Sequence, residues 1–131
     1  MKIFILTIIA ALGFAVTGVA QVPESVIVKA GQQRTAMRSK LKIKFVAVTE
    51  DSRCPIGTNC IWAGNARVKF EVINKGGGRK TIEVNTSAGP KGDQFDGWAI
   101  KLVSLTPAPR ANVILKPKNY VAKFTITRLQ R

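Results

Sequence analysis

The segment that decides the fold class is Lys40-Leu41-Lys42-Ile43-Lys44-Phe45-Val46-Ala47-Val48. Basic and apolar side chains alternate over its first six residues. Successive side chains of a β-strand point to opposite faces, so this alternation predicts a half-buried strand with its lysines in water. A second strand of the same kind is predicted where the pattern recurs, in Arg67-Val68-Lys69-Phe70-Glu71-Val72.

Four further strands are predicted from runs of β-branched and aromatic residues at 25–29, 81–85, 98–105 and 120–127. The glycines at 76–78 predict a hairpin turn, because glycine adopts positive φ at little cost. A change of phase near Val103 predicts a β-bulge. No amphipathic helix is predicted, so the crossover connections that parallel strands require are missing. The sequence therefore predicts an all-β protein, an antiparallel immunoglobulin-like β-sandwich of about six to seven strands with one short-loop disulfide.

Alternate residues of these strands are expected to form the core between the two sheets. The predicted core residues are Ile43, Phe45, Val68, Phe70, Val72, Ile82, Val84, Ile100, Leu102, Ala122, Phe124 and Ile126. Trp62 and Trp98 are expected to pack near the disulfide at one end of the sandwich.

The connection at 50–64 holds both cysteines and the densest turn chemistry of the chain. Its predicted structural residues are Asp51, Arg53, Pro55, Trp62 and Gly64. The aspartate is expected to bond nearby backbone amides, and the proline to fix one φ angle. Trp62 is expected to be a buried support for the loop, because the small residue Gly64 lets a large ring approach the backbone closely.

Cys54 and Cys60 are predicted to form a structural disulfide, since two cysteines in an exported chain usually pair. A ring of this size contributes roughly 2–3 kcal/mol on the chain-entropy estimate. A redox pair would normally show the Cys-x-x-Cys spacing. A metal site is the weaker alternative, because the chain has no histidine and two thiolates alone hold zinc or copper poorly.

Residues 1–20 are predicted to be a signal peptide, with Lys2 before an apolar run and small residues at 18–20. Cleavage is expected before Gln21, which leaves one domain over 21–131 in the periplasm or secreted. A membrane anchor is the alternative, but the run is shorter than the roughly 20 residues that a spanning helix needs. No integral membrane segment is expected after cleavage.

The mature chain would carry 20 basic and 7 acidic residues, a net charge of +13. Such a charge attracts polyanions such as nucleic acid, acidic polysaccharide, lipopolysaccharide or an anionic membrane surface, without specificity for a nucleic acid sequence. The predicted polyanion-binding residues project from the strands at 40–48 and 67–72, and they are Lys40, Lys42, Lys44, Arg67 and Lys69. The alternative is that these residues only solvate a strand face.

Enzymatic chemistry is not predicted, because serine has no histidine base and the few carboxylates are placed in turns or on strand faces. No cofactor is predicted. The first functional class is an exported binding or accessory module for an acidic envelope polymer or a partner protein. The second is a protease inhibitor that displays Arg53 or Ile56 on the disulfide-clamped loop. An enzyme of unfamiliar chemistry is the third.

The segment Asp51-Ser52-Arg53-Cys54-Pro55, followed by Cys60-Ile61-Trp62-Ala63-Gly64, resembles a family of small uncharacterised exported bacterial proteins and lipoproteins. A fainter likeness continues through 65–68, 97–102 and 105–109. The resemblance implies export and a cysteine-containing loop between two strands, and it implies no activity. This chain differs from many members in lacking a cysteine at the end of its leader, where a lipid would be attached.

Overall fold

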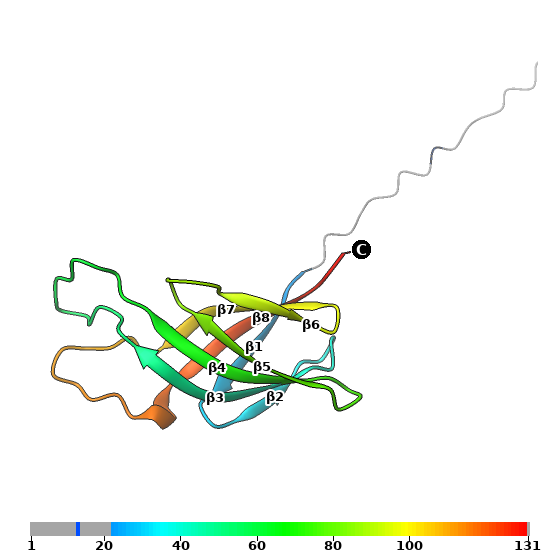
Figure 1. Ribbon diagram of the computed structural model, residues 1–131, viewed down its shortest axis with the longest axis horizontal. Coiled ribbons are helices and arrows are strands. Elements are labelled where there is room, and N and C mark those ends of the chain that lie inside the picture. The colour runs from blue at the N-terminus through cyan, green and yellow to red at the C-terminus, as the bar shows by residue number, and fades with distance from the viewer. Residues whose placement is uncertain (1–12, 14–21, 131) are drawn as a thin grey trace, which may run out of the picture.

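The computed structural model describes residue 13 and residues 22–130, and within them it forms eight strands and one short 3-10 helix. The elements are β1 (Glu24–Lys29), β2 (Gln33–Thr35), β3 (Lys42–Asp51), β4 (Ala66–Ile73), β5 (Arg79–Asn85), β6 (Gly92–Phe95), β7 (Trp98–Thr106), η1 (Pro117–Asn119) and β8 (Val121–Arg128). Two antiparallel four-stranded sheets result, in the orders β1-β8-β7-β6 and β2-β3-β4-β5 (Figure 1). The all-β antiparallel prediction is confirmed.

Strand order in both sheets follows the chain, except that β1 lies beside β8. An immunoglobulin sandwich connects its two sheets by Greek-key crossings. Here the described strands run around the core in chain order. The two-sheet architecture is therefore confirmed, whereas the immunoglobulin-like connectivity is not.

The core lies between the two sheets, where Phe70 of β4 and Phe124 of β8 meet with ring centroids 4.5 Å apart. All twelve predicted core residues are buried. The core also takes in residues that were not predicted, namely Val26, Val28, Ala36, Leu41, Ala66, Leu105 and Tyr120. The predicted bulge is confirmed by the register shift in β7 between Leu102 and Ser104.

The open edges of the two sheets lie against each other, β1 beside β2 and β5 beside β6. Glu24 joins the first pair, because its carboxylate accepts the backbone N–H of Met37 at 2.6 Å. The second pair is joined by Lys80, whose Nζ lies 3.1 Å from the carboxylate of Asp93 and donates to the carbonyl of Gln94 at 3.2 Å. These contacts cover edges that would otherwise be free to pair with another chain.

β1 and β8 meet with Glu24 opposite Ile126, so the described chain begins and ends at the same end of the molecule (Figure 1). The loops at 52–65 and 107–120 project from the other end. The predicted leader at 1–20 lies, apart from Gly13, outside the described residues. Across residues 13 and 22–130, no helix is long and apolar enough to cross a membrane.

Candidate functional site

A largely buried ion pair anchors the disulfide loop. The carboxylate of Asp51, at the end of β3, accepts bonds from Nε and Nη2 of Arg53 at 2.8 Å each, and from the hydroxyl of Tyr120 at 2.8 Å. Arg53 also donates to the carbonyls of Leu105 at 2.7 Å and Pro107 at 3.0 Å. Both charged side chains are 13% exposed. These charge-assisted bonds therefore fix the positions at which the 52–65 and 107–120 loops leave the sheets.

This arrangement sets the protonation of its members. Burial acts to raise the pKa of Asp51, but the hydrogen bonds from Arg53 and Tyr120 and the charge of Arg53 hold it below its usual 3.8. Burial, followed by the bond to Asp51, raises the pKa of Tyr120 above its usual 10.0. At neutral pH the aspartate is therefore charged and the tyrosine is a neutral donor. The predicted bond from Asp51 to a nearby amide is confirmed by Arg53 N–H, at 3.3 Å.

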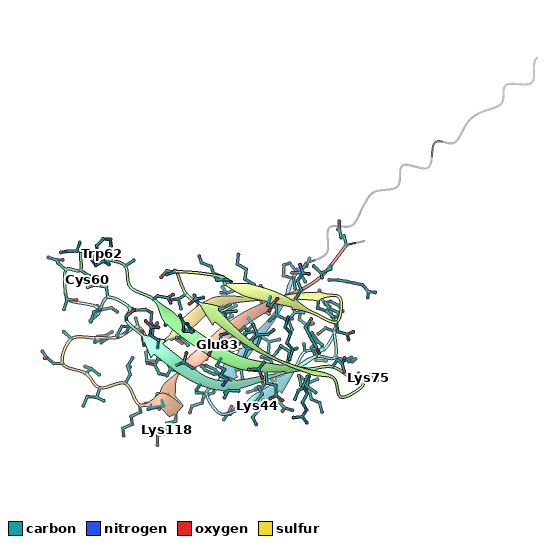
Figure 2. The ribbon with its side chains drawn as sticks, viewed as in Figure 1. Lys44, Cys60, Trp62, Lys75, Glu83 and Lys118 are labelled. Atoms are coloured by element: carbon teal, nitrogen blue, oxygen red, sulfur yellow. A yellow bond between two sulfur atoms is a disulfide. The ribbon has the colours of Figure 1, made fainter. Side chains whose placement is uncertain are left out.

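The predicted disulfide between Cys54 and Cys60 is confirmed, with the Cα atoms 5.8 Å apart. Within its ring, Thr58 donates its hydroxyl to the carbonyl of Pro55 at 2.7 Å, so the proline is part of a turn. The prediction for Trp62 is wrong. Its side chain is 81% exposed, and Figure 2 shows it with Cys60 at the end of the projecting loop. The disulfide and the turn, not a buried ring, hold this loop.

Gly64 was predicted to make room for the ring of Trp62, but it instead permits a close approach between two backbone segments. Its φ is +70°, and a Cβ there would collide with the carbonyl of Ser52. The two arms of the loop close on each other at this point, because Ser52 N–H donates to the carbonyl of Asn65 at 2.7 Å. Glycine therefore permits a close backbone approach that a side chain would block.

Trp98 does not lie near the disulfide, so this second tryptophan prediction is also wrong. It begins β7, where it pairs with Arg128, and the guanidinium carbon of Arg128 lies 5.6 Å from the ring centroid. The disulfide loop projects beyond the opposite end of β7 (Figure 1).

Two asparagines tie the 86–91 loop to the disulfide loop. Asn65 donates Nδ2 to Oδ1 of Asn85 at 2.9 Å, and its own Oδ1 accepts the N–H groups of Ser87 at 3.1 Å and Ala88 at 3.0 Å. Asn85 is buried and donates to the carbonyl of Pro90 at 3.1 Å. Buried amides need such partners, so the network fixes the path of the 86–91 loop.

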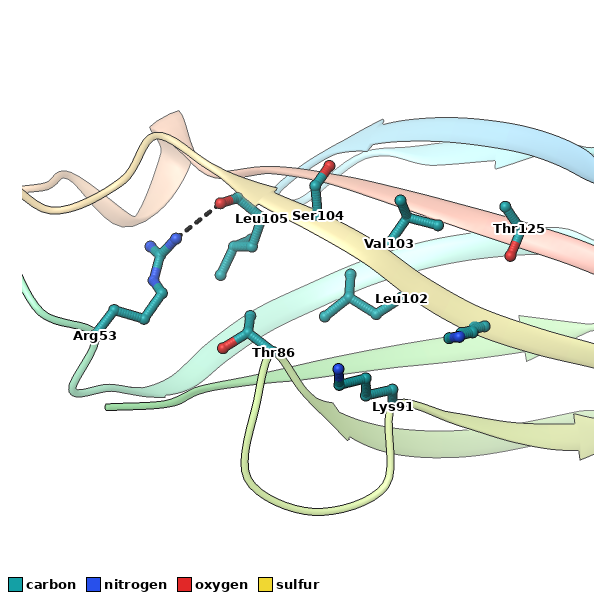
Figure 3. Close-up of a pocket in the computed structure, with 9 residues that line it drawn as sticks. Arg53, Thr86, Lys91, Leu102, Val103, Ser104, Leu105 and Thr125 are labelled. Carbon is teal, nitrogen blue, oxygen red and sulfur yellow. Dashed lines mark hydrogen bonds between the residues drawn. The ribbon is translucent and has the colours of Figure 1, made fainter. Parts of the chain in front are cut away.

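A groove of about 480 Å³, which we term the β7 groove, opens between this loop and the second half of β7 (Figure 3). Leu102 N–H donates to the carbonyl of Lys91 at 2.8 Å, which holds the loop beside the strand. Gly92 permits this approach, because a Cβ there would collide with the carbonyl of Ile100. At one end of the groove, Arg53 donates to the carbonyl of Leu105.

The polar side chains that line the β7 groove suit an anion. They include the two ammonium groups of Lys91 and Lys101 and the hydroxyls of Thr86, Ser104 and Thr125. Ammonium and hydroxyl groups donate hydrogen bonds to phosphate, sulfate and carboxylate oxygens. Among the described residues that line the groove, none is acidic.

The outer face of the β1-β8-β7-β6 sheet also carries basic side chains. Strand alternation places Lys29, Lys101 and Lys123 on this face, which we term the lysine face. The acidic residues of the same strands, Glu24 and Asp93, alternate to the other side and bond at the sheet edges. From residue 97 onward the sequence holds seven Lys and Arg residues and no Asp or Glu.

The residues predicted as a polyanion-binding patch are interspersed with acidic residues. Lys40 lies before β3 in a turn, with a φ of 62°, so it is not on the strand as expected. The other four lie on the outer face of the β2-β3-β4-β5 sheet, and they are Lys42, Lys44, Arg67 and Lys69. Three glutamates stand opposite them in register, Glu71 beside Lys44, Glu83 beside Lys69 and Glu50 beside Arg67. Glu71 also pairs with Arg79 of β5, at 3.1 Å. The positive charge of this face is therefore offset only in part by carboxylates.

The β7 groove was missed from the sequence. Lys91 follows a Gly-Pro turn and Lys101 belongs to a strand of ordinary alternation, so neither carries a local signal. Asn65 and Asn85 are polar residues next to strands, and only the fold brings their amides together. The total positive charge was the one indication of an anion site.

No family model, no curated protein and no solved structure matches this chain. The resemblance based on the cysteine and tryptophan segment stays a prediction.

Proposed function

We propose that the protein is an exported binding module of the bacterial cell envelope that holds an acidic polymer in the β7 groove and on the lysine face. The observation that carries the proposal is that Lys91, Lys101 and three residues with hydroxyl groups line one groove, whose described lining holds no carboxylate. Phosphate, sulfate or carboxylate groups along a polymer would bind there one after another. The disulfide accords with export to an oxidising compartment.

Recognition is chiefly electrostatic. Each anionic group that is neutralised by a lysine releases counterions, so affinity falls as salt rises. The hydroxyls of Thr86, Ser104 and Thr125 add directed hydrogen bonds within the groove. The lysine face extends the contact over β7, β8 and β1, which suits a polymer better than a single small anion.

The protease inhibitor is the weaker alternative. Arg53 is not displayed to solvent, because its guanidinium bonds to Asp51 and to two carbonyls. Ile56 is exposed, but its N–H donates to the carbonyl of Pro109 at 2.8 Å and its carbonyl accepts the N–H of Ala111 at 3.5 Å. An inhibitor would offer that main chain to the protease as a strand, and here it is already paired.

Retention on immobilised heparin, a sulfated polymer, tests the proposal. The triple variant Lys91→Gln, Lys101→Gln and Lys123→Gln removes three positive charges from the groove and lysine face. Its matched control removes three from the opposite sheet, as Lys42→Gln, Lys44→Gln and Lys69→Gln. We expect the groove variant to elute at lower salt than the parent. The slope of the logarithm of its binding constant against the logarithm of the salt concentration should fall in magnitude by roughly 2–3, whereas that of the control should change by less than about 1.

Equal shifts of the two variants would contradict the proposal, since retention would then depend only on net charge. Circular dichroism of both variants checks the fold. These lysines are on solvent faces, where substitutions usually change stability by less than about 0.5 kcal/mol.

A further inference from the structure

Exposed apolar side chains gather at the end of the molecule opposite the chain ends. Half of the ten large hydrophobic residues that are exposed in the described chain lie on the two loops there. These five residues, which we term the apolar tip, are Ile56, Ile61, Trp62, Val113 and Ile114. Ile61 is 91% exposed and Ile114 is 93% exposed, so both project fully into solvent. An apolar cluster of this kind on a protein surface commonly marks a contact site.

The apolar tip is preorganised by contacts within and between its two loops. Its two loops are joined by a parallel bridge between Ile56 and Arg110, in which Ile56 N–H donates to the carbonyl of Pro109 at 2.8 Å. The disulfide closes one loop, and the Asp51–Arg53 pair fixes the base of both. Little conformational entropy is therefore lost when the tip docks.

The charged side chains on the two loops of the apolar tip, 52–65 and 107–120, are all basic. The sequence has no Asp or Glu from 52 to 70, nor from 97 to its end. The second loop also carries Arg110, Lys116 and Lys118, and Figure 2 shows Lys118 at the same end of the molecule as Trp62. An apolar cluster flanked by cations matches an anionic lipid surface, where tryptophan and aliphatic side chains enter the headgroup region and cations face lipid phosphates.

We propose that the apolar tip inserts into the headgroup region of an anionic lipid bilayer. Ile61, Trp62 and Ile114 are the inserting side chains, and Arg110, Lys116 and Lys118 contact the lipid phosphates. The long axis of the sandwich then stands away from the bilayer, and the β7 groove stays open to a polymer. This inference is separate from the polymer-binding proposal, because it uses other residues and a different ligand.

Fluorescence with vesicles tests the proposal. In a Trp98→Phe background, Trp62 is the remaining tryptophan of the chain. We expect its emission to shift to the blue on addition of phosphatidylglycerol-containing vesicles, with little shift on pure phosphatidylcholine, and brominated lipids to quench it. An unshifted, unquenched emission with the anionic vesicles would overturn the proposal.

Co-sedimentation with the same vesicles distinguishes binding through the apolar tip from nonspecific binding through other exposed apolar side chains. The double variant Ile61→Ser and Ile114→Ser should bind anionic vesicles at least about tenfold more weakly. Its matched control, Ile27→Ser and Val46→Ser, removes two exposed aliphatic side chains from the strands and should bind like the parent. Equal loss in both variants, or none in the tip variant, would contradict the proposal.

Two competing roles, self-association through the tip and lipid binding through the lysine face, give different results. If the parent dimerises in analytical ultracentrifugation and the tip variant does not, the tip binds a second copy and the lipid proposal is wrong. The Lys101→Gln and Lys123→Gln changes should weaken heparin retention and leave the fluorescence shift of Trp62 in place. If they abolish the shift while the tip variant keeps vesicle binding, the lysine face is the lipid-binding surface and the tip is not.

Discussion

Replacing Asp51 with alanine tests the anchor that joins the loops to the sandwich. The change removes three hydrogen bonds of 2.8 Å and leaves the Arg53 side chain, which is 13% exposed, with its carbonyl partners alone. Breaking one side of a fully buried pair costs about 3–5 kcal/mol. Arg53 keeps its bonds to Leu105 and Pro107 and some contact with water, so we expect a loss of roughly 2–3 kcal/mol. For a domain of this size the melting temperature should fall by roughly 10 °C.

Urea unfolding followed by circular dichroism at neutral pH measures this loss. The matched control is Glu50→Ala, because the Glu50 carboxylate lies 3.9 Å from Arg67 in a pair that is about half exposed. Exposed pairs contribute little, so the control should change the free energy of unfolding by less than about 0.5 kcal/mol. If Asp51→Ala unfolds like this control, the ion pair of Asp51 and Arg53 does not anchor the loops.

The pH dependence of the same site gives a second measurement. The pKa of Asp51 is held below its usual 3.8 in the folded protein, so its charge stabilises the fold above that value. This stability is lost as the pH falls through the lower pKa of the folded state. The difference in unfolding free energy between the parent and Asp51→Asn should therefore be full at neutral pH and shrink in acid. A difference that stays constant into acid would contradict the assignment.

Three further predictions concern the loops. Alkylation without reductant should leave the intact mass unchanged, and two alkylated thiols would disprove the disulfide. The double variant Cys54→Ser and Cys60→Ser should lower the free energy of unfolding by roughly 2–3 kcal/mol. Gly64→Ala should lower the free energy of unfolding by more than about 1 kcal/mol, because the added Cβ collides with the backbone and φ is positive. The control is Gly77→Ala, where φ is +88° and the space is open, and an equal loss in both variants would mean that no collision occurs at Gly64. Trp62→Ala should change stability by less than about 0.5 kcal/mol in urea unfolding, because the ring is in solvent; a large loss would mean that it packs.

The core was predictable because its signal is local. Alternation in 40–48 and 67–72 assigns Ile43, Phe45, Val68 and Phe70 to one face, and all four are fully buried. β2 and β6 were missed because three and four residues are too few to show alternation. Such short strands are stabilised by their neighbours and not by their own sequence.

The candidate site was less predictable because it depends on contacts between distant residues. The β7 groove needs Asn65 to meet Asn85 and Lys91 to lie beside Leu102, and neither pair is marked in the sequence. Trp62 was predicted to be buried because the small residue Gly64 lets a large ring approach the backbone closely. Its exposure follows from a loop that is closed by its disulfide and its own backbone.

The pairing of β1 with β8 has a mechanical consequence. Glu24 lies opposite Ile126 at the end where both strands leave the sheet, so tension applied through the two chain ends acts across the first hydrogen bonds of that ladder. The bonds then break one after another, as a zipper opens, and not all together as they do when strands slide along each other. The sandwich should therefore begin to unfold at that end under a low pulling force. The disulfide loop at the other end should be among the last parts to come under tension.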